Sequence, residues 1–231
     1  MKVNRGKRGQ FIIIAVMIVA VMIVSMGVLM HNAITYYKHE PWEEYSALIG
    51  DIEINSRKLV ELSLASYTNS LEPISIIETN LNKWEKDLVD AYPSRGITLT
   101  SSDTTMLSSS NTNAYTATSK AQASFTLDVK SIGLEGYTFN VFTSLTLSIK
   151  SVTPLESNMI EVIAVVESET GLPIKDLSKT NFKVENATNL AVSAAYDSNN
   201  ILEYRIIHNG SANSSVEVYD QRGIRVIVNS S

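Results

Sequence analysis

Few residues of this chain have the types and spacing that catalysis or metal binding requires. The 231 residues include no cysteine and three histidines, His31, His39 and His208. Without cysteine, disulfides, thiol catalysis and cysteine-ligated zinc sites are excluded. No other ligand lies at metal-site spacing from a histidine, so we expect three solvated surface side chains. The nucleophile elbow, the phosphate-binding loop and the dinucleotide fingerprint are also missing.

The carboxylates have structural explanations. Glu43 and Glu44 lie on an amphipathic stretch, where they are expected to form a solvated face. Asp197, Asp220 and nearby asparagines could hold Ca²⁺ between loops, but the spaced-Asp loop that makes such a site specific is missing. We therefore predict no enzymatic activity, no metal and no cofactor.

Covalent modification is a second kind of chemistry that the sequence offers. Four Asn-x-Ser/Thr sequons are candidate glycosylation sites: Asn186, Asn209, Asn213 and Asn229. Asn209 and Asn213 belong to a cluster of turn-forming residues and are the favoured pair. Asn229 lies close to the end of the chain, which weakens it as a site.

The N-terminal region predicts a membrane anchor. Residues 1–10 carry four Lys or Arg, and residues 11–30 carry no charge. Twenty helical residues span about 30 Å, the thickness of a bilayer's hydrocarbon core. The positive-inside rule then predicts a single-pass protein of the cell membrane, with residues 1–10 cytoplasmic and the C-terminus extracellular. A cleaved secretory signal, which has a shorter apolar core, and a buried core helix are the alternatives.

The junction Lys7-Arg8-Gly9-Gln10-Phe11 resembles the N-termini of archaeal type IV pilin-like precursors, which carry a class III signal peptide. The resemblance implies cleavage between Gly9 and Gln10, followed by packing of the apolar helix in a filament core. The sequence departs from the pilin pattern at Ile14, where many pilins have Glu.

The next segment, 31–152, is predicted to be an α+β stalk domain. Apolar residues at steps of three and four predict helices over 42–67 and 70–92, which together form a helical hairpin. Near-strict alternation of apolar and polar residues predicts strands over 125–129 and 137–149, joined as an antiparallel hairpin. The Ser- and Thr-rich stretch 101–123 is predicted to be a long loop because it offers little apolar surface to bury.

The last segment, 155–231, predicts a β-sandwich, since short apolar strands alternate with turn-forming residues. Residues 169–177, followed by Asn181-Phe182-Lys183-Val184, are similar to the opening of immunoglobulin-like repeats of prokaryotic surface proteins. That resemblance implies an immunoglobulin-like fold without implying one function.

The expected fold class is an N-terminal transmembrane helix plus an α+β ectodomain, with a helical hairpin on an antiparallel sheet followed by an immunoglobulin-like β-sandwich. The expected function is that of a membrane-anchored cell-surface structural or adhesive protein. A type IV pilin-like filament subunit and a non-catalytic accessory subunit of a membrane complex are the alternatives. The expected partners are the lipid bilayer, surface proteins or copies of the chain itself. The net charge of −5 argues against nucleic acid.

Overall fold

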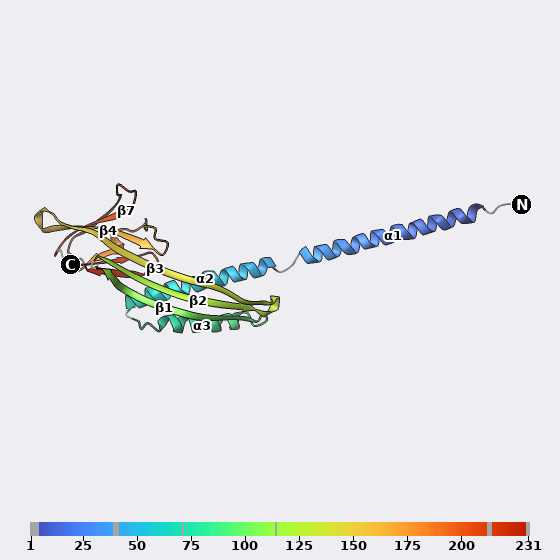
Figure 1. Ribbon diagram of the computed structural model, residues 1–231, viewed down its shortest axis with the longest axis horizontal. Helices are drawn as coiled ribbons and strands as arrows, with labels where there is room; N and C mark the ends of the chain where they lie inside the picture. Colours follow the sequence, from blue (N-terminus) through green and yellow to red (C-terminus); the bar gives the residue numbers. More distant parts are fainter. Residues whose placement is uncertain (1–4, 39–41, 71, 114, 212–213, 230–231) are drawn as a thin grey trace. The chain divides into compact units, whose positions relative to one another are not determined.

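The computed structural model describes residues 5–38, 42–70, 72–113, 115–211 and 214–229. The chain divides into two compact units, Met1–Asp51 and Ile52–Ser231. Three helices, α1 (Arg5–Lys38), α2 (Trp42–Ser70) and α3 (Ile76–Ala91), precede a series of antiparallel strands (Figure 1). Strands β3 (Leu134–Pro154) and β4 (Met159–Ser168) are antiparallel neighbours in one sheet.

Helix α1 is a single continuous helix of 34 residues. Within the described part of the chain, however, no helix is both long enough and apolar enough to cross a membrane. This finding contradicts the predicted transmembrane helix over 11–30, and with it the predicted single-pass topology and cell-membrane localisation.

Helices α2 and α3 correspond to the predicted helical hairpin. Within the second unit, hydrogen bonds join them: the Trp84 indole N–H donates to Ser56 Oγ over 3.0 Å, and the Asn80 amide donates to Ser63 Oγ over 3.0 Å. Their apolar stripes are buried, with Ile52, Val60 and Leu64 of α2 and Ile77, Leu81 and Leu88 of α3 each at most 2% exposed. Helix α3 lies along β1 (Figure 1).

The larger sheet has six strands in the order β1-β2-β3-β4-β7-β6. Three long strands form one half of it: β1 (Ile97–Asn113), β2 (Thr116–Val129) and β3 (Leu134–Pro154). The β2–β3 register, with Leu127 opposite Tyr137, confirms the predicted antiparallel hairpin. The prediction of a loop over 101–123 is wrong, because β1 and β2 pair along most of that stretch.

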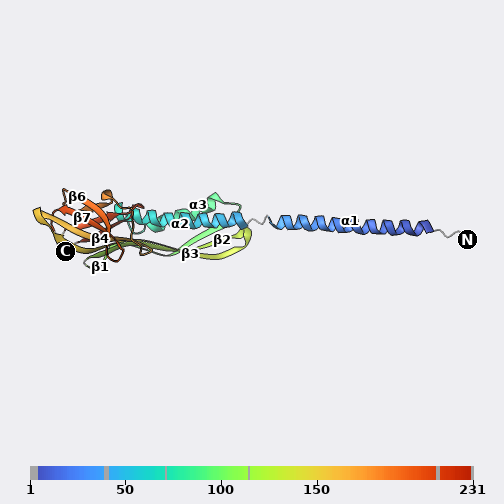
Figure 2. The ribbon, with the colours of Figure 1, turned by 90° about the horizontal axis from the view of Figure 1, so that it is seen from above.

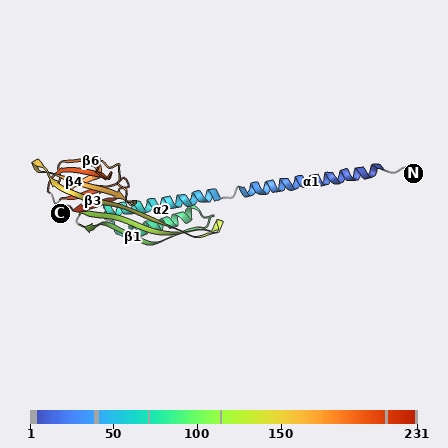
Figure 3. The same ribbon diagram turned by 45° about the horizontal axis from the view of Figure 1, so that its top comes forward.

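The other half of this sheet consists of β4 (Met159–Ser168), β7 (Leu202–Asn209) and β6 (Leu190–Tyr196). A second, three-stranded sheet contains β5 (Phe182–Val184), β8 (Ser215–Tyr219) and β9 (Arg225–Asn229). Alternate residues of both sheets are buried, and the Phe182 and Tyr204 rings meet between them at a centroid distance of 5.1 Å. Figures 2 and 3 show β4, β6 and β7 grouped at one end of this unit.

Candidate functional surfaces

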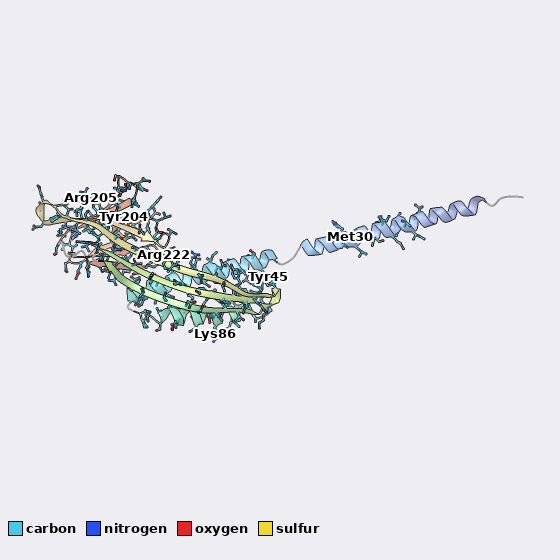
Figure 4. All side chains as sticks on the ribbon, viewed as in Figure 1. Met30, Tyr45, Lys86, Tyr204, Arg205 and Arg222 are labelled. Atoms are coloured by element: carbon cyan, nitrogen blue, oxygen red, sulfur yellow. The ribbon has the colours of Figure 1, made fainter. Side chains whose placement is uncertain are left out.

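The most extensive apolar surface among the described residues lies on α1. Its Val, Ile, Leu and Met side chains from Val16 to Met30 are each between 53% and 70% exposed. Consecutive residues of a helix are rotated by about 100°, so a continuous apolar run presents such side chains on every side. Figure 4 shows these side chains, with Met30 labelled, projecting around the helix. We call residues 16–30 the α1 apolar surface.

An apolar surface of this kind requires a cover. A helix that is hydrophobic all round is normally buried, and a large exposed apolar patch marks a site of association. Burying one Val, Leu, Ile or Met side chain contributes about 1.5–3 kcal/mol. The α1 apolar surface has twelve such side chains, so its burial would supply far more free energy than an ordinary interface requires.

The residues of the predicted processing site lie at the beginning of the same helix. Gly9 and Gln10 both fall within α1, which begins at Arg5. Their side chains are outside the described set, and cleavage between them stays a prediction.

The four candidate glycosylation sites differ in their surroundings. Asn186 is exposed, with a φ of 58° in a turn after β5. Asn209 Oδ1 instead accepts hydrogen bonds from the backbone N–H groups of Thr188 and Asn189 at 3.0 and 2.7 Å, and its amide nitrogen donates to Thr188 Oγ1. The Asn209 amide therefore ties the loop before β6 to the end of β7. Geometry favours Asn186 over Asn209, the reverse of the sequence-based preference.

The structure says less about the remaining two sequons, at Asn213 and Asn229. Asn229 is exposed at the end of β9, whereas Asn213 lies outside the described residues. Glycosylation at all four positions stays a prediction.

A partly buried cluster of charges surrounds Arg222, in the turn between β8 and β9. Its guanidinium donates to Asp220 Oδ2 at 2.6 Å, to Glu169 Oε2 at 2.8 Å, to Thr143 Oγ1 at 2.9 Å and to the Ser144 carbonyl at 3.0 Å. Glu61 of α2 lies 3.8 Å away. Arg222, labelled in Figure 4, thus connects α2, β3, the end of β4 and the β8–β9 turn.

The pKa values of two carboxyl groups near Arg222 are shifted in opposite directions. Burial raises the pKa of Glu61 above its usual value. Burial also disfavours the charged form of Glu169, but the hydrogen bond and charge of Arg222, together with hydrogen bonds from backbone groups, outweigh burial and lower the pKa of Glu169. A neighbouring cavity of about 290 Å³ is lined by Glu61, Glu169, Asp176, Asp220 and Arg222 among others. The Arg222 guanidinium donates hydrogen bonds to the carboxylates that surround it. We therefore interpret this cluster as a structural link between elements rather than a reaction site.

The metal-ligand candidates do not converge. Among the residues with described side chains, no group of three or more His, Asp or Glu could hold a metal ion. Asp197 Oδ1 accepts the N–H groups of Asn199 and Ile201, both at 2.8 Å, and so closes the β6–β7 turn. Asp220 Oδ1 accepts the N–H groups of Arg222 and Ile224 in the β8–β9 turn.

The prediction that all three histidines are solvated surface residues holds only in part. His31 is exposed on α1, and His39 lies outside the described residues. His208 of β7 is only 1% exposed. Burial lowers the pKa of His208 below its ordinary value. The prediction of a solvated His208 is therefore wrong, because β7 is an interior strand between β4 and β6.

No protein family matches the chain, and no curated protein and no solved structure is detectably similar to it. The resemblances to archaeal type IV pilin-like precursors and to immunoglobulin-like repeats accordingly stay predictions.

Proposed function

We propose that this chain is a non-catalytic structural subunit that assembles with copies of itself into a filament through α1. The observation that carries the proposal is the α1 apolar surface, exposed on every side over residues 16–30. Copies of the chain are a natural cover, because each brings an equivalent apolar helix. Helices packed around one another would bury all sides at once, as an all-round apolar helix requires.

Two further features support a structural role. The second unit has its own buried core. The junction at Gly9 and Gln10 resembles a pilin-type processing site, which fits a helix destined for a filament core.

The test uses the purified full-length chain without detergent or lipid. Three substitutions, Val21→Lys, Val24→Lys and Val28→Lys, place cations at positions that are 64%, 65% and 54% exposed. We expect the wild-type chain to form large assemblies in sedimentation velocity and electron microscopy. The triple-lysine variant is expected to remain dispersed, because desolvating an unpaired ammonium opposes burial.

A matched control replaces the same three valines by isoleucine, which keeps the surface apolar and should preserve assembly. Near-UV circular dichroism checks that the second unit is folded in every variant. A dispersed wild-type chain, or a triple-lysine variant that assembles like the wild type, would overturn the proposal. Mass spectrometry of protein from its native cells adds a separate readout: a first residue of Gln10 supports pilin-like processing, and an intact Met1 counts against it.

A further inference from the structure

The edges of the two sheets are protected unequally. An exposed strand edge presents unpaired N–H and C=O groups to other chains, and proteins usually block it with charges, bulges, prolines or covering segments. Along β1, the pairing with β2 is interrupted by three register shifts, and the outward N–H of Ser101 donates to Glu85 of α3 over 2.7 Å. That edge is both irregular and partly covered.

The edges of the smaller sheet are also blocked. On β9, the N–H of Arg225 donates to Thr68 Oγ1 over 3.1 Å, and the N–H of Ile227 donates to Ser109 Oγ over 3.2 Å. Strand β5 has only three residues, with the exposed Lys183 in the middle. Both are poor templates for another strand.

Strand β6 has no charge, proline or bulge to protect its edge. Its seven residues, Leu-Ala-Val-Ser-Ala-Ala-Tyr, include no charge and no proline, and its pairing with β7 runs without a register shift. Among the described strands it pairs with β7 alone. From Ser193 to Tyr196 every residue is exposed, and Tyr196 is 57% exposed.

The geometry of the β6–β7 hairpin identifies the free backbone groups. The Asp197 N–H donates to the Ile201 carbonyl over 2.9 Å, which fixes a hydrogen-bonded pair at the end of the hairpin. Such pairs recur at every second residue of an antiparallel ladder. The N–H and C=O groups of Ala191, Ser193 and Ala195 therefore face β7, and the groups that point to the open edge belong to Leu190, Val192, Ala194 and Tyr196.

We propose that two copies of this chain pair edge to edge through β6, antiparallel and around a two-fold axis at Ser193. This register makes hydrogen-bonded pairs of Leu190 with Tyr196 and of Val192 with Ala194 of the second copy, for about eight new hydrogen bonds. On the other face, Ala191 meets Ala195 and Ser193 meets Ser193. Two six-stranded sheets become one continuous sheet.

The side chains suit a second copy of the same strand. The register places the two largest residues, Leu190 and Tyr196, opposite each other, and it brings no like charges together because β6 has no charged residue. The exposed Tyr196 also lines a cavity of about 330 Å³ with Leu172, Pro173 and Leu202, and Leu190 of the second copy would lie against its ring. A seven-residue pairing buries less surface than a standard interface, so the dimer should be weak on its own.

A charge-swap experiment tests this pairing in the triple-lysine background, where α1 assembly is removed. Ser193→Lys or Ser193→Glu alone places like charges opposite each other at the axis, and each should weaken dimerisation by up to about fivefold. An equimolar mixture of the two should restore it, whereas Ser193→Thr should leave it unchanged. Sedimentation velocity from about 10 μM to 1 mM provides the readout over the range expected for a weak interface.

A second measurement does not depend on the background. The wild-type chain has no cysteine, and opposed Cα atoms at a non-hydrogen-bonded pair lie about 4.5 Å apart, within reach of a disulfide. With dissolved oxygen as oxidant, Ser193→Cys should form a cross-linked dimer much faster than Ser131→Cys, an exposed control in the short 3-10 helix between β2 and β3.

The contradicting outcomes are distinct. A triple-lysine chain that stays monomeric at 1 mM, a mixture that fails to restore dimers, or equal cross-linking at Ser193 and Ser131 would each overturn β6 pairing. Failure of the α1 proposal would instead appear as assemblies of the triple-lysine chain that are as large as those of the wild type, well beyond dimers, and the cysteine experiment would still report on β6.

Discussion

At the scale of single residues, Arg222 has the most consequential contacts. Its partner Asp220 is nearly buried, with a side chain that is 3% exposed, so removing the guanidinium leaves a buried carboxylate without its cation. We expect Arg222→Met to lower the free energy of unfolding by about 3 kcal/mol. The matched control is Arg205→Met, since Arg205 is 54% exposed and pairs with Glu161 at the surface. That change should cost less than about 1 kcal/mol.

Urea denaturation of both variants measures the difference. Equal losses for Arg222→Met and Arg205→Met would show that the Arg222 cluster does not tie the second unit together. A double-mutant cycle with Asp220→Asn then measures the coupling between the two side chains directly.

His208 should make stability depend on pH. Because burial lowers its pKa, the unfolded chain binds a proton more readily than the folded chain. Stability from the neutral imidazole is therefore complete above the ordinary pKa of 6.5 and is lost as the pH falls toward the lower folded value, by up to about 1.4 kcal/mol per pH unit.

The measurement compares urea midpoints at pH 7.5 and 5.5 for the wild-type chain and for His208→Leu. We expect the variant to lose less stability between these pH values, whatever its stability at pH 7.5. An identical pH dependence in both proteins would contradict the assignment.

Neither residue could be identified from local sequence. Arg222 lies in a predicted turn, and its partners Thr143 and Glu169 come from distant segments, so no spacing marks the cluster. His208 was predicted to be exposed because it precedes the turn-forming residues Asn209-Gly210 at the end of an alternating strand. Burial depends on β4 and β6 both pairing with β7, which a single strand does not reveal.

At the scale of elements, periodicity identified the helices and the β2–β3 hairpin but missed most of β1 and the first half of β2. The buried residues there are small: Ala117, Ala121 and Ala123 are each at most 1% exposed. Small side chains contribute little apolar area and leave a weak signal. They also allow close approach, as the hydrogen bond of 2.6 Å from Ser119 Oγ to the Arg225 carbonyl of β9 shows.

The cap that α2 places on the edge of β9 provides a test at this scale. Thr68→Val removes the acceptor of the Arg225 N–H and leaves that donor without a partner. We expect a loss of about 1–2 kcal/mol in the free energy of unfolding. Thr79→Val is the control, because Thr79 is exposed and bonds only within its own helical segment. Comparable losses at both positions would argue against the cap.

At the scale of the whole molecule, the proposed self-assembly gives the two units different roles. The second unit is a folded body with a buried core, and α1 offers an apolar surface that nothing in its own unit covers. The apolar run over residues 11–30 is evident from the sequence. The sequence does not show whether lipid or protein covers this run, since both are apolar. The predicted bilayer crossing is wrong, because no described helix is both long enough and apolar enough to span a membrane.

Methionine oxidation tests self-assembly most directly. Met17, Met22, Met26 and Met30 are 65% to 70% exposed on α1, whereas Met106 in the second unit is 2% exposed and serves as an internal reference. Hydrogen peroxide is added without lipid or detergent, and peptide mass spectrometry follows each residue. In the assembled wild-type chain the four α1 methionines should oxidise at least about tenfold more slowly than in the triple-lysine variant, because packing excludes the oxidant. Equal, rapid oxidation of these four residues in both proteins would contradict burial of α1 between copies.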